Sequence, residues 1–512
     1  MSNRLYNKSP FWTRLSGTPF LALAMLSLGC SGAATPPAAD GGSKAGGGSS
    51  SSGGGHASGG GSRPDGSGGI GQGGEGSTEN SCGLAGAAFC EDFEDPKPGG
   101  RAGDLDESRW HFGRWGHTTT SMFLRQPSET LTMRSGGPVK YQSTFCGEEF
   151  SGINMPDDVR YCDGVGPFGN TSKQLNEVFD DQGDFGYNSM RITQPFDFTG
   201  RTGAVVWEVD AKINPDNIGH GWWFEIWVTE DPGPMPYHNA PTVIGNPKRG
   251  VGFAFQFAKR CQQSPTNWMN ALETVHIIDD YHPTRVLQGF DLASTTCFKV
   301  ADAKLNRFRL EISKDKAVLR ASDYDGTEFT YSETVEDMNL PFERGYVHFQ
   351  HAQYNAHKDG DASPVQTFRW DNIGFDGPAL PVPRSYQAAD NTQSKEDGIY
   401  FGYDLTGGKT AKLDWNDVSL EGAERARFNF NLHSSAGSRF HYRFNGGGWH
   451  DFTVPQAGDE NGQVSSVLFR TFSLEAPLSE LVEGKNTVEV SLDGAEFTEG
   501  ITNLELFLET GE

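Results

Sequence analysis

The sequence predicts an all-β body made of two sandwiches, the second smaller than the first, behind a disordered N-terminal tether. Long segments of helical period are absent. A spacing of two between apolar residues is typical of half-buried antiparallel strands. It occurs in short runs such as 205–211 (VVWEVDA), 308–312 (FRLEI), 428–432 (FNFNL) and 504–508 (LELFL). About 430 residues follow the tether, which is too many for one sandwich and indicates two.

The N-terminus, residues 1–29, has the three parts of a secretory signal peptide. A basic region precedes the apolar run 19–28, and Gly29 follows it. That run is too short to span a bilayer, which needs roughly 20 apolar residues. The sequence SLGC at 27–30 resembles a lipoprotein signal, which implies that Cys30 is lipidated and becomes the mature N-terminus. We therefore expect an exported protein anchored to a bacterial membrane, at the outer membrane or the cell surface. Ordinary secretion with an unmodified Cys30 is the alternative.

Composition divides the rest of the chain. Residues 30–80 hold Cys30 and then mostly Gly, Ser, Ala, Pro and Asp, a composition that cannot bury a core and predicts a disordered linker. Prolines cluster at 377–385 and the strand pattern is lost there, which marks the joint between the sandwiches. We expect the first sandwich at 82–378 and the accessory one at 386–512.

The net charge of −25 argues against several partners. A chain without a basic stripe is a poor partner for nucleic acid, and it should meet a membrane only through its lipid anchor. An acidic surface is compatible with neutral polysaccharide. The sequence contains no serine nucleophile elbow, phosphate-binding loop or dinucleotide fingerprint, so we expect no organic cofactor.

The seven cysteines fit an oxidising compartment. Once Cys30 is set aside, an even number remains, which indicates disulfides in an exported chain. Metal-binding spacings such as paired CxxC are absent, so a structural zinc site is not expected. Six cysteines allow fifteen connectivities. Sequence order favours three local pairs: Cys82–Cys90, Cys146–Cys162 and Cys261–Cys297.

The ends of the first sandwich resemble a known superfamily. It opens with CEDFED at 90–95 and DLDESRW at 104–110, and it closes with FRWDNIGF at 368–375. This bracketing is similar to the concanavalin A-like lectin and glucanase superfamily, which includes glycoside hydrolase family 16 and laminin G-like modules. The resemblance implies a jelly roll of two curved sheets whose concave face binds glycans. It also implies a structural calcium ion at Asp371, for which a strand-end turn residue is the alternative.

One strand, 221–230 (GWWFEIWVTE), divides its side chains between two faces. Phe224, Ile226 and Val228 should meet the core, which leaves Trp223, Glu225 and Trp227 on the other face. Aromatic rings pack on sugar rings and carboxylates accept hydrogen bonds from hydroxyls, so this face predicts a glycan groove. A solvated sheet face with a second core layer under a loop is the alternative. Three further strands would add polar groups if they share the sheet: Arg191, Gln256, His348, Gln350 and Tyr354.

Catalysis is the main alternative to binding. Family 16 hydrolases carry ExDxxE, and the matching segment implies Glu225 as nucleophile and Glu230 as acid/base, but Trp227 stands where the motif has Asp. Only a β-bulge would bring both glutamates to one face at the roughly 5–5.5 Å of a retaining mechanism. A binding module needs neither the Asp nor the bulge, so polysaccharide or glycoconjugate binding is our leading hypothesis.

A jelly-roll polysaccharide lyase is a second enzyme reading. HFQHAQYN at 348–355 resembles the closing motif of alginate lyases and implies Tyr354 as the proton-transferring tyrosine. Arg191 would neutralise a uronate and Gln256 would match the glutamine of their QIH motif. The histidine of that motif corresponds to Ala258, so His348 or His276 would have to replace it as the base. A purely structural surface protein is the third class.

The second sandwich offers a weaker signal. The run HYRFNGGGWH at 441–450 predicts a hairpin with an Asn445-Gly446 turn. Trp415, Tyr442 and Trp449 could form a sugar platform, although core or hairpin packing is the more common role of such aromatics.

Overall fold

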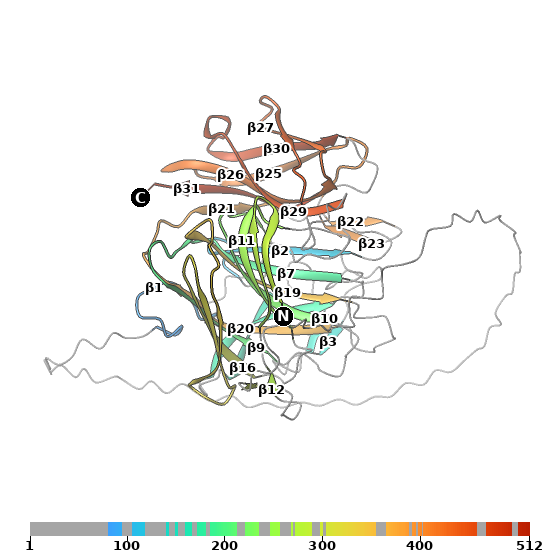
Figure 1. Cartoon of the computed structure of the whole chain (residues 1–512). Coiled ribbons are helices and arrows are strands. Elements are labelled where there is room, and N and C mark those ends of the chain that lie inside the picture. The colour runs from blue at the N-terminus through green and yellow to red at the C-terminus, as the bar shows by residue number, and fades with distance from the viewer. Residues whose placement is uncertain are drawn as a thin grey trace, which may run out of the picture. The chain divides into compact units, whose positions relative to one another are not determined.

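A computed structural model gives the protein's fold (Figure 1). The described residues all belong to one compact unit, Glu75–Glu512. The predicted signal peptide, Cys30 and residues 31–79 of the predicted tether lie outside them. The structure describes residues 80–94, 105–117, 140–142, 149–151, 159–165, 171–180, 185–211, 221–234, 246–256, 268–269, 272–288, 297–300, 304–354, 365–388, 392–395, 398–401, 403–457, 467–493 and 500–511.

The first sandwich consists of two eight-stranded antiparallel sheets in the described part of the chain. One sheet has the order β18 (Phe329–Val335), β17 (Ala317–Ser322), β16 (Leu305–Ile312), β9 (Gly203–Asp210), β20 (Val365–Asp376), β6 (Thr171–Asp180) and β5 (Val159–Val165), with β1 (Ala87–Glu91) paired to β20. The other has the order β14 (His282–Gln288), β13 (Leu272–Asp279), β11 (Arg249–Gln256), β10 (Gly221–Thr229), β19 (Arg344–Tyr354), β7 (Phe185–Ile192) and β2 (Trp110–His117), with β8 (Phe196–Asp197) paired to β19. We call this second sheet the site sheet.

The core of the first sandwich lies between these two sheets. Phe224, Ile226 and Val228 of β10 join one buried cluster with Trp207 of β9 and Phe308 of β16. The rings of Trp207 and Phe308 stack in parallel with centroids 5.2 Å apart. The prediction that the apolar face of β10 meets the core is therefore confirmed.

Strand β9 is buried on both faces, which alternation alone would not predict. Its residues Ala204 and Val206 pack under the N-terminal segment that holds Cys82 and Leu84. This segment therefore buries the outward-facing side chains in the first half of β9.

The second sandwich consists of two smaller sheets with their own core. Figure 1 shows its strands in orange to red. One sheet has the order β21 (Arg384–Gln387), β31 (Gly500–Thr510), β26 (Ala423–Ser435) and β29 (Val467–Glu475), with β24 (Tyr403–Asp404) paired to β31. The other has the order β25 (Thr410–Val418), β30 (Gly484–Asp493), β27 (Arg439–Phe444) and β28 (His450–Thr453). Asn445 and Gly446 follow β27 with φ of 49° and 73°, the left-handed values of the predicted turn.

The remaining elements are small. Among the residues that the structure describes, three two-stranded ribbons pair β3 (Lys140–Gln142) with β4 (Glu149–Ser151), β12 (Trp268–Met269) with β15 (Phe298–Lys299), and β22 (Thr392–Lys395) with β23 (Gly398–Phe401). A 3-10 turn, η2 (Leu478–Glu480), precedes β30. In the described ranges, no helix has the length and apolarity needed to cross a bilayer. The predicted all-β fold, a larger sandwich followed by a smaller one, is confirmed.

Candidate functional site

The strands predicted to carry the groove do share one sheet. Arg191 lies on β7, Glu225 and Trp227 on β10, Gln256 on β11, and His348, Gln350 and Tyr354 on β19, all in the site sheet. The antiparallel pairing aligns residues of neighbouring strands, so the polar face forms rows that run across the strands.

The first row is rich in histidine and is called the histidine row. His348 pairs with Trp227 on one side and Arg191 on the other. The row continues through Gly252 at one end and His111 at the other. Across six strands it reads His276, Gly252, Trp227, His348, Arg191 and His111.

The next row is centred on Glu225 and is called the glutamate row. Glu225 pairs with Ala254 on β11 and Gln350 on β19. Its Oε2 accepts hydrogen bonds from Trp227 Nε1 and Gln350 Nε2, both at 2.6 Å. The carboxylate is therefore held by its own neighbours on the sheet.

These side chains do not line an open groove, which corrects the sequence-based expectation. Arg191, Glu225 and Trp227 are each 1% exposed, Gln350 is 2% exposed and His348 is 0% exposed. Trp227 packs over Gly252, where an added Cβ would come within 2.4 Å of the indole, and stacks with His276 at a centroid distance of 6.2 Å. The Trp227 indole is therefore part of the packed interior and is not available to stack on a sugar ring.

Arg191 is buried because the second sandwich supplies its partner. Its Nη2 donates to Glu505 Oε1 at 2.6 Å and its Nη1 to Glu505 Oε2 at 2.8 Å. Asn429 Nδ2 donates to the same carboxylate at 2.8 Å. Burial by itself would raise the pKa of Glu505, but the charge of Arg191 outweighs it and lowers the pKa to about 2. The lyase hypothesis requires Arg191 to neutralise a uronate. Its bidentate pair with Glu505 leaves it unable to do so.

Other contacts join the same two regions. Tyr346 of β19 meets Phe507 of β31 edge to face at 5.6 Å. Arg427 of β26 pairs with Asp231, just after β10, at 2.9 Å. Gln387 Nε2 donates to the Trp110 carbonyl at 2.8 Å. The sheet that contains β26 and β31 thus packs against one end of the polar face.

His348 is also poorly suited to act as the base of a lyase. Its Nε2 lies 2.9 Å from Thr229 Oγ1. Burial, together with the charges of Arg191 and His111, lowers the pKa of His348 well below its usual range. The imidazole is therefore neutral and shielded from solvent, which does not suit the substitute base of a lyase.

Glu225 and Glu230 do not form a catalytic pair. The pairing of β10 with both neighbours runs without a bulge from Gly221 to Thr229. Alternation therefore directs Glu230 away from the face of Glu225. Glu230 is a third exposed and pairs with Arg249 at 3.2 Å. The two-carboxylate reading is wrong for these residues because the required bulge is missing.

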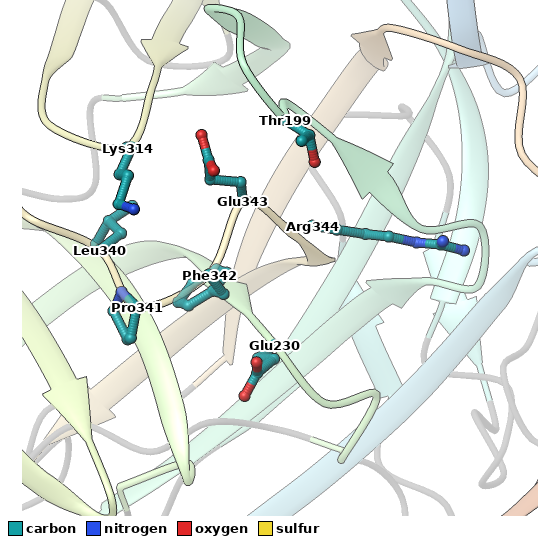
Figure 2. A pocket seen from close by; sticks show the side chains of 8 residues that line it. All are labelled: Thr199, Glu230, Lys314, Leu340, Pro341, Phe342, Glu343 and Arg344. Atoms are coloured by element: carbon teal, nitrogen blue, oxygen red, sulfur yellow. The ribbon is translucent and has the colours of Figure 1, made fainter.

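Glu230 instead borders a pocket of about 300 Å³ at the end of the first sandwich (Figure 2). Leu340, Pro341 and Phe342 contribute its apolar side, and Glu343 and Lys314 add charge. Arg344 extends away from the other labelled residues in Figure 2. The pocket does not reach the glutamate row.

A third row lies further along the polar face and is called the aromatic row. Trp223 pairs with Gln256 on β11 and Ala352 on β19. Ala352 pairs with Tyr187 on β7, and Tyr187 with Trp115 on β2. Tyr354 lies one row beyond, opposite Gly221. The side chains of Trp223, Gln256 and Tyr354 are outside the described part, and the structure gives their places on the strands.

Sequence reasoning missed two members of this row. Trp115 and Tyr187 lie four residues from His111 and Arg191 on their strands, so alternation places all four on the same face. Extending the period-two pattern from Arg191 back to Tyr187 would have found one of them. Trp115 needed the pairing of β2 with β7, which the sequence does not show.

The disulfide predictions are tested in part. Cys82 and Cys90 are bonded, with a Cα–Cα distance of 6.0 Å. Cys297 is also in a disulfide, and its predicted partner Cys261 lies outside the described residues. Cys146 and the Cys162 side chain lie outside them too, so that pair stays a prediction.

The calcium prediction at Asp371 finds little support in its surroundings. Asp371 is buried and its Oδ1 accepts the Asn372 N–H at 2.8 Å. The neighbouring Glu208 accepts from Asn372 Nδ2 at 2.9 Å, and burial raises the pKa of Glu208 to about 7. Within the described ranges no three Asp, Glu, His or Cys side chains gather as metal ligands. Calcium at Asp371 stays a prediction.

The second sandwich separates its three candidate aromatics. Trp415 is 1% exposed and Tyr442 is 8% exposed, and both belong to the core. Trp449 is 44% exposed. The prediction that all three aromatics form a sugar platform is therefore wrong, because Trp415 and Tyr442 lie in the core.

Comparison with known proteins gives structural neighbours only. No protein-family model matches the sequence, and no curated protein matches it. A legume lectin-like domain from Entamoeba histolytica is 12% identical over 43% of this chain and 89% of its own, with a TM-score of 0.26. The family GH16 endo-beta-1,3(4)-glucanase SCLam is 10% identical over 56% and 89%, with a TM-score of 0.30. A glycosyl hydrolase family protein from Mycobacterium fortuitum is 10% identical over 56% and 99%, with a TM-score of 0.27. The function proposed below therefore rests on this chain's own residues.

Proposed function

We propose that the protein is an exported, lipid-anchored surface protein that binds polysaccharide through the polar face of the site sheet. The observation that carries the proposal is the aromatic row, in which Trp115, Tyr187, Trp223 and Gln256 hold consecutive register positions around the small Ala352. Aromatic rings with a few polar groups on a concave sheet suit a sugar chain.

The buried rows support this use of the sheet. Glu225 accepts hydrogen bonds from Trp227 and Gln350. These bonds hold β10, the strand that carries Trp223, in place. A binding face on rigid strands loses little conformational freedom when ligand arrives.

Neutral glycans are the favoured ligand class. Arg191, the cation that the sequence places on this face, is neutralised by Glu505. The chain itself carries a net charge of −25. Both features disfavour a polyanionic ligand such as alginate.

The test uses the full exported chain with two neutral glycans, β-glucan and galactan, and with the polyanion alginate. It measures both retention and product release. Trp223→Ala should weaken the free energy of glycan binding by about 1–3 kcal/mol, a scale taken from aromatic stacking on nucleic-acid bases. Phe329→Ala is the matched control, because Phe329 is an aromatic residue that is 38% exposed on β18. If no glycan retains the wild-type protein, the structural reading replaces binding.

Catalysis is tested by a second variant. Glu225→Gln should leave the affinity within about fivefold of the wild type, because the amide still offers an oxygen to its neighbours and a net hydrogen bond is worth about 1 kcal/mol. Reducing ends released by the wild type and lost in this variant would show hydrolysis instead. Unsaturated products lost in Tyr354→Phe would show a lyase.

A further inference from the structure

The hairpin between β27 and β28 presents one large aromatic to water. Trp449 is 44% exposed at its end, while Trp415 and Tyr442 of the same sandwich are buried. A single exposed aromatic is common on protein surfaces and does not mark a site. What surrounds Trp449 is the reason to assign it one.

The turn that carries Trp449 is held rigidly. Asn445 donates its backbone N–H to the Thr487 carbonyl at 2.9 Å and accepts the Thr487 N–H on Oδ1 at 2.9 Å. Asn445 Nδ2 donates to the Glu480 carbonyl at 2.8 Å and to Asn486 Oδ1 at 2.9 Å. On the other side, His450 stacks on Tyr442 with centroids 5.0 Å apart and bonds Glu480 at 2.9 Å. The chain is therefore held in place on both sides of Trp449.

An ion pair lies beside the indole. The guanidinium carbon of Arg443 is 4.5 Å from the Trp449 ring centroid. Arg443 Nη2 and Nε donate to Glu489 Oε2 at 2.5 Å and 3.1 Å. Lys412 Nζ lies 3.7 Å from Glu489 Oε1. Lys412, Glu489 and Arg443 are consecutive register partners on β25, β30 and β27, so they share the outer face of this sheet.

We propose that Trp449, Arg443 and Glu489 form a second glycan-binding site, which takes one pyranose ring of a neutral polysaccharide. A pyranose has an apolar C–H face and a rim of hydroxyls. The first would stack on the indole, and the second would bond the donors of Arg443 and the acceptors of Glu489. Glu489 occupies the Nε and Nη2 donors of Arg443, which a sugar carboxylate would otherwise take, so the site favours an uncharged sugar.

The surroundings favour a sugar over a protein partner. A protein interface centres on several clustered apolar or aromatic residues. Here the outer-face neighbours of Trp449 are charged or polar, and among the described residues of this sandwich Val482 is the other large exposed hydrophobic side chain. This proposal shares no residue with the site sheet and can hold if the first site fails.

Fluorine NMR of the full chain labelled with 5-fluorotryptophan tests the site. The resonance that disappears in Trp449→Phe is that of Trp449. It should shift on addition of soluble β-1,3-glucan or β-1,4-galactan, and Arg443→Met should weaken that binding about tenfold. Phe329→Ala should leave it unchanged, and the melting temperature of Trp449→Phe should equal that of the wild type.

Two results would overturn the assignment. One is a Trp449 resonance that stays in place with both neutral glycans at about 10 mM sugar, where even a Kd of 1 mM gives near-saturation. The other is a shift with alginate alone, which would contradict the neutral class. Repeating the titration in Trp223→Ala separates the two sites, since the Trp449 shift should persist when the site sheet no longer binds.

Discussion

Removing Arg191 should destabilise the protein far more than removing an ordinary surface cation. Arg191 and Glu505 are 1% and 0% exposed and form a bidentate pair between the two sandwiches. Arg191→Met leaves the Glu505 carboxylate buried without its counterion, which costs about 3–5 kcal/mol. The lowered pKa of Glu505 points in the same direction. Its fall from 4.5 to about 2 corresponds to about 3 kcal/mol of stabilisation.

The pH dependence has a definite sign. Because the folded-state pKa of Glu505 is lowered, its contribution is present above pH 4.5 and is lost as the pH falls toward about 2. The wild type should therefore lose stability across this window. Glu505→Gln should be less stable than the wild type at pH 7, and the difference between the two should shrink on acidification.

Urea unfolding followed by tryptophan fluorescence measures these effects. The control is Lys316→Met, which removes a pair with Glu336 whose side chains are 47% and 58% exposed, and it should cost less than about 1 kcal/mol. Arg191→Met with Glu505→Gln should cost less than the sum of the single changes. If Arg191→Met costs no more than Lys316→Met, or if the double variant is additive, the reasoning is refuted.

Three further predictions concern other parts of the chain. Gly252→Ala should destabilise the fold by about 1–3 kcal/mol in the same urea assay, since the new Cβ would lie 2.4 Å from the Trp227 indole; a midpoint equal to that of the wild type would show that the indole can move. Cys30→Ser should move the protein from the membrane fraction to the soluble exported fraction, and unchanged partitioning would exclude lipidation at this residue. If calcium binds at Asp371, a calcium chelator should lower the melting temperature and added calcium should restore it; no change in either step would leave Asp371 as a strand-end residue.

Much of the fold was readable because period two is a local property. The alternation in β10 predicted which side chains meet the core, and Phe224, Ile226 and Val228 do so. The same alternation placed Glu225 and Trp227 together on the opposite face. The Asn445-Gly446 pair predicted its turn because few residues adopt positive φ without strain.

The tertiary structure decided what covers each face. Glu505 stands between Leu504 and Leu506, in a pattern that would suit a solvent-facing position, yet it is fully buried against Arg191. Alternation distinguishes two faces of a strand but says nothing of a partner that lies 314 residues away in the chain. Strand register, which brings Trp115 and Tyr187 into line with Trp223, likewise depends on long-range pairing. The sequence alone therefore determined the strands and their faces, whereas long-range packing decided which polar residues are buried and which remain for a ligand.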